Sequence, residues 1–461
     1  MQSHRQVKER SFLAIRPLLL VMGLMGPAVG AFGFYGVFLL LLCCIPTFVR
    51  SGASRLEAQQ ASICMLGVAI LAYGLIPGVI HSGAEWAGYQ FAVIAISGSV
   101  FVAFTFVPRA GFSIDKLMRW LWRFSWILLT LCLLEVFSGV RLPVSRYSAM
   151  APYLGFAYEG SEGVSEVFEG LWVPTGFFGN QNNLSFMLTC LLPFALADCR
   201  TAAARMTMAA TSFFVIFLSE SRVALVTLVV WGCTSAFVAA LRHVKPWSLA
   251  VILVLAAGAV PLAYNTLEET CAEATTKLCF GVTLLHSVDL EDLPFLNDSI
   301  GIRLQLASQA LRLWAASPIV GVGPGHLSHL ISAVHSDGIV ITDLHNPPLQ
   351  VLVEYGIAGS ALWLSAFWIV LRSVLAIPRM PARSGKFRKV ALTLLWIMPI
   401  ASISVSTMYY FIPLWVLLGT MFGAALELNR GAAGDASHAR SEGGSVGLAD
   451  AFRRGVARGA H

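Results

Sequence analysis

Long runs of apolar residues, separated by short polar segments, dominate the hydrophobic pattern of the chain. A helix that crosses a bilayer needs about 20 mostly apolar residues, because the hydrocarbon layer is about 30 Å thick. About twelve stretches reach or approach this length, and they are residues 12–29, 31–49, 60–79, 88–108, 119–138, 181–198, 206–221, 222–241, 247–264, 347–371, 389–407 and 410–427. The pattern therefore predicts an all-α polytopic membrane protein with about 12 transmembrane helices.

Composition points to the same class. The 461 residues are 57% hydrophobic and only 12% charged, with a mean hydropathy of +0.74. This apolar share is far above that of ordinary soluble domains. No small-residue cleavage site followed by a soluble domain comes after residues 12–29, so we expect this first stretch to be a retained span and not a signal peptide.

Basic residues gather on one side of the predicted topology. Most of the 31 Lys and Arg residues fall in loops on the side that carries both termini, which the positive-inside rule makes cytoplasmic. The loops of the opposite side carry Arg141, Arg146, Arg222, Lys277, Arg303 and Arg312. The net charge of +6 follows from this bias, so it does not indicate a nucleic-acid partner.

Two long loops face the outer side in this topology. We expect N-terminal transmembrane helices over 1–138, an outer loop over 139–180, transmembrane helices over 181–264, a large outer loop over 265–346, C-terminal transmembrane helices over 347–429 and a disordered cytoplasmic tail over 430–461. Loops of this length inside a compact protein are usually functional or disordered. Residues 299–316 of the second loop mix apolar positions with polar ones, which predicts an amphipathic helix that lies along the membrane surface or caps the helical bundle.

Cys271 and Cys279 both fall in the second outer loop. A disulfide that closes this short loop is our expectation if the outer compartment is oxidising, and two separate thiols are the alternative. The sequence has no Cys and His set with zinc spacing and no acidic cluster typical of a metal site, so we expect chemistry without a metal or another cofactor.

The stretch TDLHNPPLQVLVEYGIAG, residues 342–359, places a histidine just before a predicted span. Asn346 suits the N-cap and Pro347 the first helical position, so His345 should lie at the outer membrane surface. The partial positive charge of the helix N-terminus disfavours imidazolium, and a neutral imidazole can accept a proton. The exposed N–H groups would also favour an anion such as phosphate. A histidine that only caps an interfacial helix is the alternative.

Three arginines share this outer side with the histidine. Arg222 follows LSES at the start of a span, and Arg303 and Arg312 lie on the predicted loop helix. The planar guanidinium group suits phosphate oxygens, because it can donate two parallel hydrogen bonds. Arg222 could instead snorkel or pair with Glu220, and Arg312 could simply be solvated.

Polar groups near two further helix starts are candidate supporting residues. Asn180 and Asn182 lie in TGFFGNQNNLSF, where their amides could bind sugar hydroxyls or only cap the helix. Glu354 lies about nine residues beyond His345, roughly 13 Å along a helix. A carboxylate at that depth needs a partner or a proton, so Glu354 is either structural or an orienting group. The connector SPIVGVGPGHL, residues 317–327, allows tight turns and a close backbone approach.

Four of these segments together resemble the O-antigen ligase and polymerase superfamily. HNPPLQVLVEYGIAG resembles its H-N-x-x-L...E-x-G-x-x-G signature, and FFGNQNNL its F-G-N-x-N element. SESRVAL resembles its S-R segment, and SIGIRLQLASQALRLWAASPIVGVGPGHL its R...W...P-x-x-G-x-G-x-G loop helix. The four elements occur in order over about residues 175–360, whereas the first 140 residues match only as generic spans.

This resemblance implies an enzyme of the bacterial inner membrane with a GT-C-like fold, a periplasmic active site and both termini in the cytoplasm. Such ligases move O-antigen glycan from undecaprenyl diphosphate to a sugar hydroxyl of lipid A-core in lipopolysaccharide biosynthesis. His345 would be the general base, with Arg222 and Arg303, and in the outer loop also Arg312, binding the donor diphosphate. Asn346, Glu354, Asn180 and Asn182 would be supporting residues. The reaction would be metal-independent and inverting, because no carboxylate is placed to form a glycosyl-enzyme intermediate.

Three other functions are alternatives to a ligase. A polymerase would extend a lipid-linked glycan, and its loops resemble those of ligases. Protein O-oligosaccharyltransferases share the histidine signature but generally carry an additional C-terminal region, so we expect them less. A glycolipid transporter would use the arginines only for binding; charges strung through the bundle would favour it, whereas here the candidate groups lie on the outer side.

Overall fold

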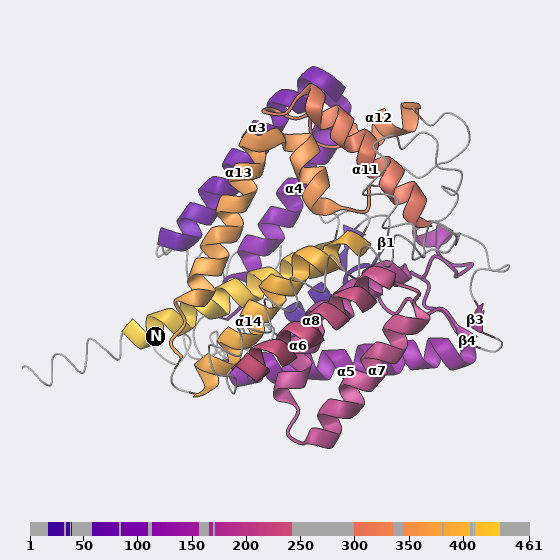
Figure 1. Ribbon diagram of the computed structural model, residues 1–461, viewed down its shortest axis with the longest axis vertical. Helices are drawn as coiled ribbons and strands as arrows, with labels where there is room; N and C mark the ends of the chain where they lie inside the picture. The colour runs from indigo at the N-terminus through magenta and orange to yellow at the C-terminus, as the bar shows by residue number, and fades with distance from the viewer. Residues whose placement is uncertain are drawn as a thin grey trace, which may run out of the picture.

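The computed structural model describes residues 17–31, 34–36, 38, 58–82, 84–108, 113–155, 166–168, 171–241, 299–334, 344–379, 382–405, 409 and 411–433. Within these residues the chain is almost entirely helical (Figure 1). The α-helices are α3 (Ala58–Ser82), α4 (Ala84–Phe104), α5 (Ile114–Ser138), α6 (Gln181–Asp198), α7 (Ala202–Leu218), α8 (Arg222–Leu241), α11 (Ser299–Ala316), α12 (His326–Val334), α13 (Pro347–Leu375), α14 (Ala382–Ala401) and a last helix, Ile412–Ala433. Short 3-10 turns occur at η1 (Gly26–Val29), η3 (Pro152–Leu154) and η5 (Ser402–Ser404).

Two small antiparallel pairs depart from the all-α prediction. β1 (Gly30–Ala31) pairs with β2 (Phe34–Tyr35), and β3 (Glu166–Phe168) pairs with β4 (Leu171–Trp172). The first pair follows a helix over residues 17–25 that ends at Gly26, where φ is +52°. The predicted span 12–29 therefore turns before its expected end, because η1 and the β1–β2 hairpin follow the helix directly.

Five described helices are long and apolar enough to cross a membrane, and they are Ala58–Val79, Ile114–Ser138, Pro347–Leu375, Arg383–Ser404 and Ile412–Ala433. The shorter apolar helices are Gly88–Phe104, Ala202–Leu218 and Arg222–Ser235. An integral membrane protein with several spans fits these helices. The count of 12 is not confirmed, because the predicted span 247–264 and most of 31–49 lie outside the described residues.

The largest apolar core joins α5, α6, α14 and the last helix. Phe124, Phe186, Phe387 and Phe422, one from each helix, are almost fully buried in it. At one end of this group, Arg383 of α14 lies 3.0 Å from Asp115 of α5, and Lys386 lies 3.6 Å from Asp198 of α6. Exposed ion pairs of this kind contribute little stability. They do show that helix ends expected on the same basic side lie together.

A second group consists of α3, α4 and α13, with α11 and α12 packed at one end (Figure 1). Leu306 of α11, Ile331 of α12 and Val353 of α13 share a small buried core with Leu344. The predicted amphipathic helix over 299–316 is confirmed as α11. Its apolar side packs on α13 and α12, so this part of the second outer loop is folded onto the helical bundle.

Helix α13 is broken at Gly356, where φ is 61° and ψ is −170°. In an α-helix the N–H of Ile357 and Ala358 would bond to the carbonyls of Val353 and Glu354. Instead, Ile357 N–H donates to Pro318 O at 2.9 Å, and Ala358 N–H donates to Ile319 O at 3.1 Å.

The two carbonyls released by this break are also satisfied by the connector after α11. Val322 N–H donates to Val353 O, and Gly323 N–H donates to Glu354 O, both at 3.0 Å. Residues 318–323 therefore replace both interrupted helical bonds with four inter-segment bonds, and we call this pairing with residues 353–358 the backbone lock.

Only residues without a side chain can meet at the centre of the backbone lock. A Cβ built on Gly321, whose φ is +81°, would lie 2.5 Å from the backbone N of Gly356. Tyr73 of α3 closes the lock from the other side. Its hydroxyl lies 3.3 Å from Ile319 O and 3.4 Å from Val320 O, so it can donate to either carbonyl of the connector.

We predict that Gly321→Ala lowers the thermal unfolding temperature of the purified protein. A non-glycine residue in the left-handed region costs roughly 1–2 kcal/mol, and here the methyl group also clashes with backbone that cannot move aside. Gly67→Ala on α3 is the matched control, because a Cβ there meets nothing within 4 Å. Equal unfolding temperatures for the two variants in detergent would contradict the tight packing of the backbone lock.

Candidate functional site

His345 lies at the turn that starts α13. Its φ of +48° turns the chain between Leu344, which is buried, and Asn346. The side chain of Asn346 accepts a hydrogen bond from Leu349 N–H at 3.2 Å, and Pro347 is the first helical residue. The predicted N-cap is therefore confirmed. His345 itself is half-buried, and its Nδ1 atom is enclosed by the protein.

Two residues other than glycine have a positive φ in the described part of the chain, Glu220 and His345. Such backbone is uncommon outside glycine, and it clusters at functional sites when the surrounding structure holds it in place. Glu220 lies two residues before Arg222, and its carbonyl accepts from Arg222 N–H at 3.0 Å. Both turns thus lie beside or at candidate residues named from the sequence, Arg222 and His345.

Glu354 is fully buried and has a side-chain partner. Gln350 donates from Nε2 to Glu354 Oε1 at 3.0 Å, and Gln350 N–H donates to Asn346 O at 2.8 Å. Asn346, Gln350 and Glu354 follow each other at four-residue spacing, so they lie on one face of α13. The expectation that a carboxylate at this depth needs a partner is met by Gln350, which sequence reasoning had not named.

The three candidate arginines lie in different settings. Arg222 is the first residue of α8 and is exposed. Position 303 of α11 shares a helical face with Leu306 and Ala310, the residues that pack towards Leu344 and Val353.

Position 312 is nine residues further along α11, which is half a turn around the helix. Arg312 is accordingly exposed, on the face away from this core. Position 303 is thus in helical register with Leu306 and Ala310, and position 312 is not.

Asn180 is the N-cap of α6, where its side chain accepts from Asn183 N–H at 2.8 Å. The capping alternative therefore describes Asn180, whereas Asn182 is half-buried on the first turn of α6. The segment before this cap is held by Glu135 near the end of α5. Glu135 is 1% exposed, and its Oε2 accepts from the backbone N–H of Thr175 at 2.8 Å and of Gly176 at 2.7 Å.

Sequence reasoning missed Glu135, although a signal was present. A carboxylate three residues before the end of a predicted span, 119–138, must find a partner. The partner could not be read from the sequence, because Thr175 and Gly176 are 40 residues away along the chain.

Arg141 and Arg146 lie beside the same segment and face one ring. Their guanidinium carbons are 5.3 Å and 5.9 Å from the ring centroid of Tyr147, whose hydroxyl donates to Gln181 Oε1 at 3.0 Å. Burial lowers the pKa of both guanidinium groups, and Glu135 and Tyr147 oppose this for Arg141. Both arginines stay charged, so positive charge is fixed beside the start of α6.

The structure thus brings together the His345 turn, Asn346, Glu354 and the face of α11 that carries Leu306 and Ala310. Asn180, Asn182 and Arg222 belong to the neighbouring α6 and α8 helices, where Ser185 of α6 contacts Ser219 before α8. Cys271 and Cys279 lie outside the described residues, so their pairing stays a prediction. In the described part of the chain, no three His, Cys, Asp or Glu residues are grouped as metal ligands.

A comparison with known protein families finds a match over the segment that contains most of the candidate residues. Residues 207–364 match the family model of the O-antigen ligases. This model is shared by ligases and polymerases, enzymes that transfer glycans in surface polysaccharide assembly. The match covers part of the chain, from within α7 to the middle of α13, and includes Arg222, Arg303, Arg312, His345 and Glu354. A comparison with curated proteins finds no match.

The match supports the resemblance deduced from the motifs at the level of this family. The family acts on lipid-linked glycans in general, so the match indicates this class of substrate and does not identify the glycan or the acceptor. Asn180, Asn182 and Glu135 precede the matched residues, so their roles depend on the geometry alone.

We predict that Glu135→Ala lowers the thermal unfolding temperature more than Glu135→Gln does. The alanine leaves two buried backbone N–H groups without an acceptor, and each such loss costs about 1–3 kcal/mol. The glutamine keeps one side-chain oxygen for them. Unfolding of both variants in detergent, followed by intrinsic fluorescence, measures the difference, and an unchanged midpoint for Glu135→Ala would show that this carboxylate does not hold the 175–176 segment.

Proposed function

We propose that this protein is an O-antigen ligase that transfers glycan from undecaprenyl diphosphate to a sugar hydroxyl of lipid A-core. One observation carries the proposal: within residues 207–364, which match the ligase family model, His345 is fixed in a left-handed turn against the capped start of α13. A rigid imidazole at a helix N-terminus is suited to accept a proton next to an anionic substrate. The cellular setting that follows from this proposal is the bacterial inner membrane, with the site facing the periplasm.

In the proposed reaction the acceptor hydroxyl oxygen attacks the anomeric carbon of the donor sugar. The new C–O bond forms as the bond to the diphosphate oxygen breaks, and that oxygen leaves with the bonding electrons as undecaprenyl diphosphate. His345 takes the hydroxyl proton and later releases it to solvent. Attack opposite the leaving group inverts the anomeric carbon. The diphosphate is already a good leaving group, so orientation and a base supply most of the required catalysis.

Arginine side chains are proposed to bind the donor diphosphate. Arg222 at the start of α8 and Arg303, in helical register with Leu306 and Ala310 of α11, are the first choices. Fixed positive charge stabilises the negative charge that develops on the leaving oxygen. Arg312 lies on the opposite face of α11, so its proposed contribution is a weaker, long-range attraction for the donor.

A reconstituted assay tests this proposal. Purified protein in proteoliposomes receives undecaprenyl-diphosphate-linked glycan with or without lipid A-core, and products are followed by mass. Glycan joined to lipid A-core is the expected result. Longer glycans on undecaprenyl diphosphate, formed without lipid A-core, would instead identify a polymerase, and donor moved across the membrane unchanged would identify a transporter.

We predict that His345→Ala lowers the transfer rate at least 100-fold while donor binding stays within about threefold, because removal of a general base typically costs 10²–10⁴-fold. His329→Ala on α12 is the control, because it removes an exposed histidine of the same region. The rate constant for transfer and donor binding by microscale thermophoresis are measured separately. Normal turnover by His345→Ala would remove the base assignment.

We predict that Arg303→Ala and Arg222→Ala raise the donor concentration needed for half-maximal rate about tenfold or more. Lysine at either position should restore part of this loss, since it keeps the charge but not the paired hydrogen bonds. Arg312→Ala should change the rate less than twofold, which makes it an internal control on the same helix. A larger effect at Arg312 than at Arg303 would reverse the assignment of the two faces of α11.

A further inference from the structure

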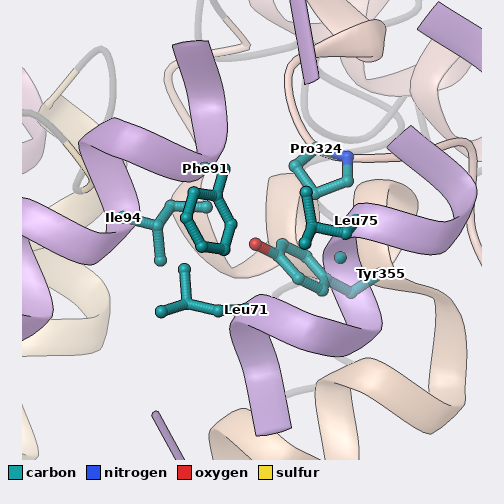
Figure 2. A pocket seen from close by; sticks show the side chains of 7 residues that line it. Leu71, Leu75, Phe91, Ile94, Pro324 and Tyr355 are labelled. Atoms are coloured by element: carbon teal, nitrogen blue, oxygen red, sulfur yellow. The ribbon is translucent and has the colours of Figure 1, made fainter. Parts of the chain in front are cut away.

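The buried hydroxyl groups of the described helices have different surroundings. Ser125 of α5 and Thr189 of α6 each donate to a carbonyl one turn earlier in the same helix, at 2.8 Å. The hydroxyl of Tyr355 in α13 points towards apolar side chains of α3 and α4 beside a cavity of about 10 Å³, as Figure 2 shows. Ser185 of α6 instead bonds to Ser219, which lies in the turn between α7 and α8.

The contact between Ser185 and Ser219 is a hydrogen bond between two elements, and both side chains are fully buried. The Ser219 hydroxyl donates to Ile216 O at 2.6 Å, and a hydroxyl has one proton to donate. Ser185 is therefore the donor to Ser219 Oγ. The backbone N–H of Ser219 donates to Val215 O at 3.0 Å and ends α7, so the bond from Ser185 ties the end of α7 to α6.

This anchored serine begins the turn that carries Arg222. Glu220 follows with a φ of +55°, and its carbonyl accepts from Arg222 N–H at 3.0 Å. The turn buries its two serines, Ser219 and Ser221, and exposes the charged residue that follows each of them. The left-handed region is unfavourable for a residue other than glycine, so such a turn persists only when its surroundings hold it. The bond from Ser185 supplies this support one residue before Glu220.

The same face of α6 carries a candidate residue. Asn182 is half-buried and lies three residues before Ser185, so the two are neighbours on one face of the helix. Helix α6 also contacts both α7 and α8. The anchor at Ser185 therefore relates the start of α6 to the start of α8, where Arg222 lies.

We infer that Ser185 is a positioning residue for Arg222. Its hydrogen bond to Ser219 holds the turn between α7 and α8, and the turn holds the guanidinium group in place for the diphosphate of the substrate. Ser185 is fully buried and acts only through this turn. The inference rests on the proposed function, because that function gives Arg222 a diphosphate to bind.

Ser185→Ala removes this one bond between elements. Alanine is favourable inside a helix, and Ser219 keeps its own bond to Ile216 O, so the variant should fold. Ser125→Ala on α5 is the matched control, because this serine is also buried but donates within its own helix. Each substitution is made in the wild type and in Arg222→Ala. The dissociation constant for undecaprenyl diphosphate is measured by microscale thermophoresis on the full chain in detergent.

We predict that Ser185→Ala raises this dissociation constant about three- to tenfold, the effect expected of one hydrogen bond between membrane helices. In the Arg222→Ala background the same substitution should change it less than twofold, because the positioned group is gone. Ser125→Ala should change it less than twofold in both backgrounds. Hydrogen exchange of the backbone N–H groups of residues 219–225 should be faster in Ser185→Ala than in Ser125→Ala.

An unchanged dissociation constant in Ser185→Ala would overturn the inference. So would an equal loss of binding with and without Arg222, since Ser185 would then have a structural role only. Faster exchange at 219–225 without weaker binding would overturn it as well. Binding and exchange need no glycan transfer: a loss of binding that depends on Arg222, in a protein that transfers no glycan, refutes the proposed function alone. Transfer with a loss of binding that does not depend on Arg222 refutes the positioning role alone.

Discussion

The backbone lock between residues 318–323 and 353–358 is the constraint on which the arrangement of the candidate site depends. A broken helix leaves N–H and C=O groups without partners, and each costs several kcal/mol in apolar surroundings. Here the connector after α11 supplies two donors and two acceptors, one for each group of the two interrupted bonds. The break is therefore stable only when connector and helix are together, so neither segment can move without the other.

This constraint fixes the direction of the first part of α13. Residues 347–355 can point away from the line of the rest of the helix, because Gly356 takes up the change of direction. Val353 and Leu344 then pack on α11, while Glu354 and Gln350 join along the adjacent face. His345 is positioned at the end of this short, braced segment. Its placement thus depends on packing at both ends: the N-cap at one end and the backbone lock at the other.

Sequence reasoning predicted the features of this site that depend on local chemistry. Asn346 as N-cap, Pro347 at the first helical position and the helix over 299–316 all depend on neighbouring residues or on periodicity, and all are found. The break at Gly356 was not predicted, because glycine inside an apolar run is compatible with a straight helix. Its partner strand of backbone begins 38 residues earlier by residue number, at Pro318, and spacing gives no sign of that pairing.

The sequence already places positions 303 and 312 on opposite faces of a helix, because nine residues leave a difference of half a turn. The sequence alone did not show which of these two faces of α11 is buried. Leu306 and Ala310 settle it, since their contacts with Leu344 and Val353 exist only in the folded chain. The same holds for Glu135. The sequence shows that a carboxylate inside a predicted span needs a partner, but it does not show that the partners are the backbone N–H groups of residues 175 and 176.

Helix α13 has different groups at its start, at its break and beyond the break. His345 and Asn346 precede or cap it, Glu354 and Tyr355 lie at the break, and Trp363 and Phe367 further along line an apolar space of about 560 Å³ against α3 and α4. The break at Gly356 is consistent with this arrangement, because it lets the polar and apolar parts of one helix face different surroundings while the backbone lock keeps their separation constant.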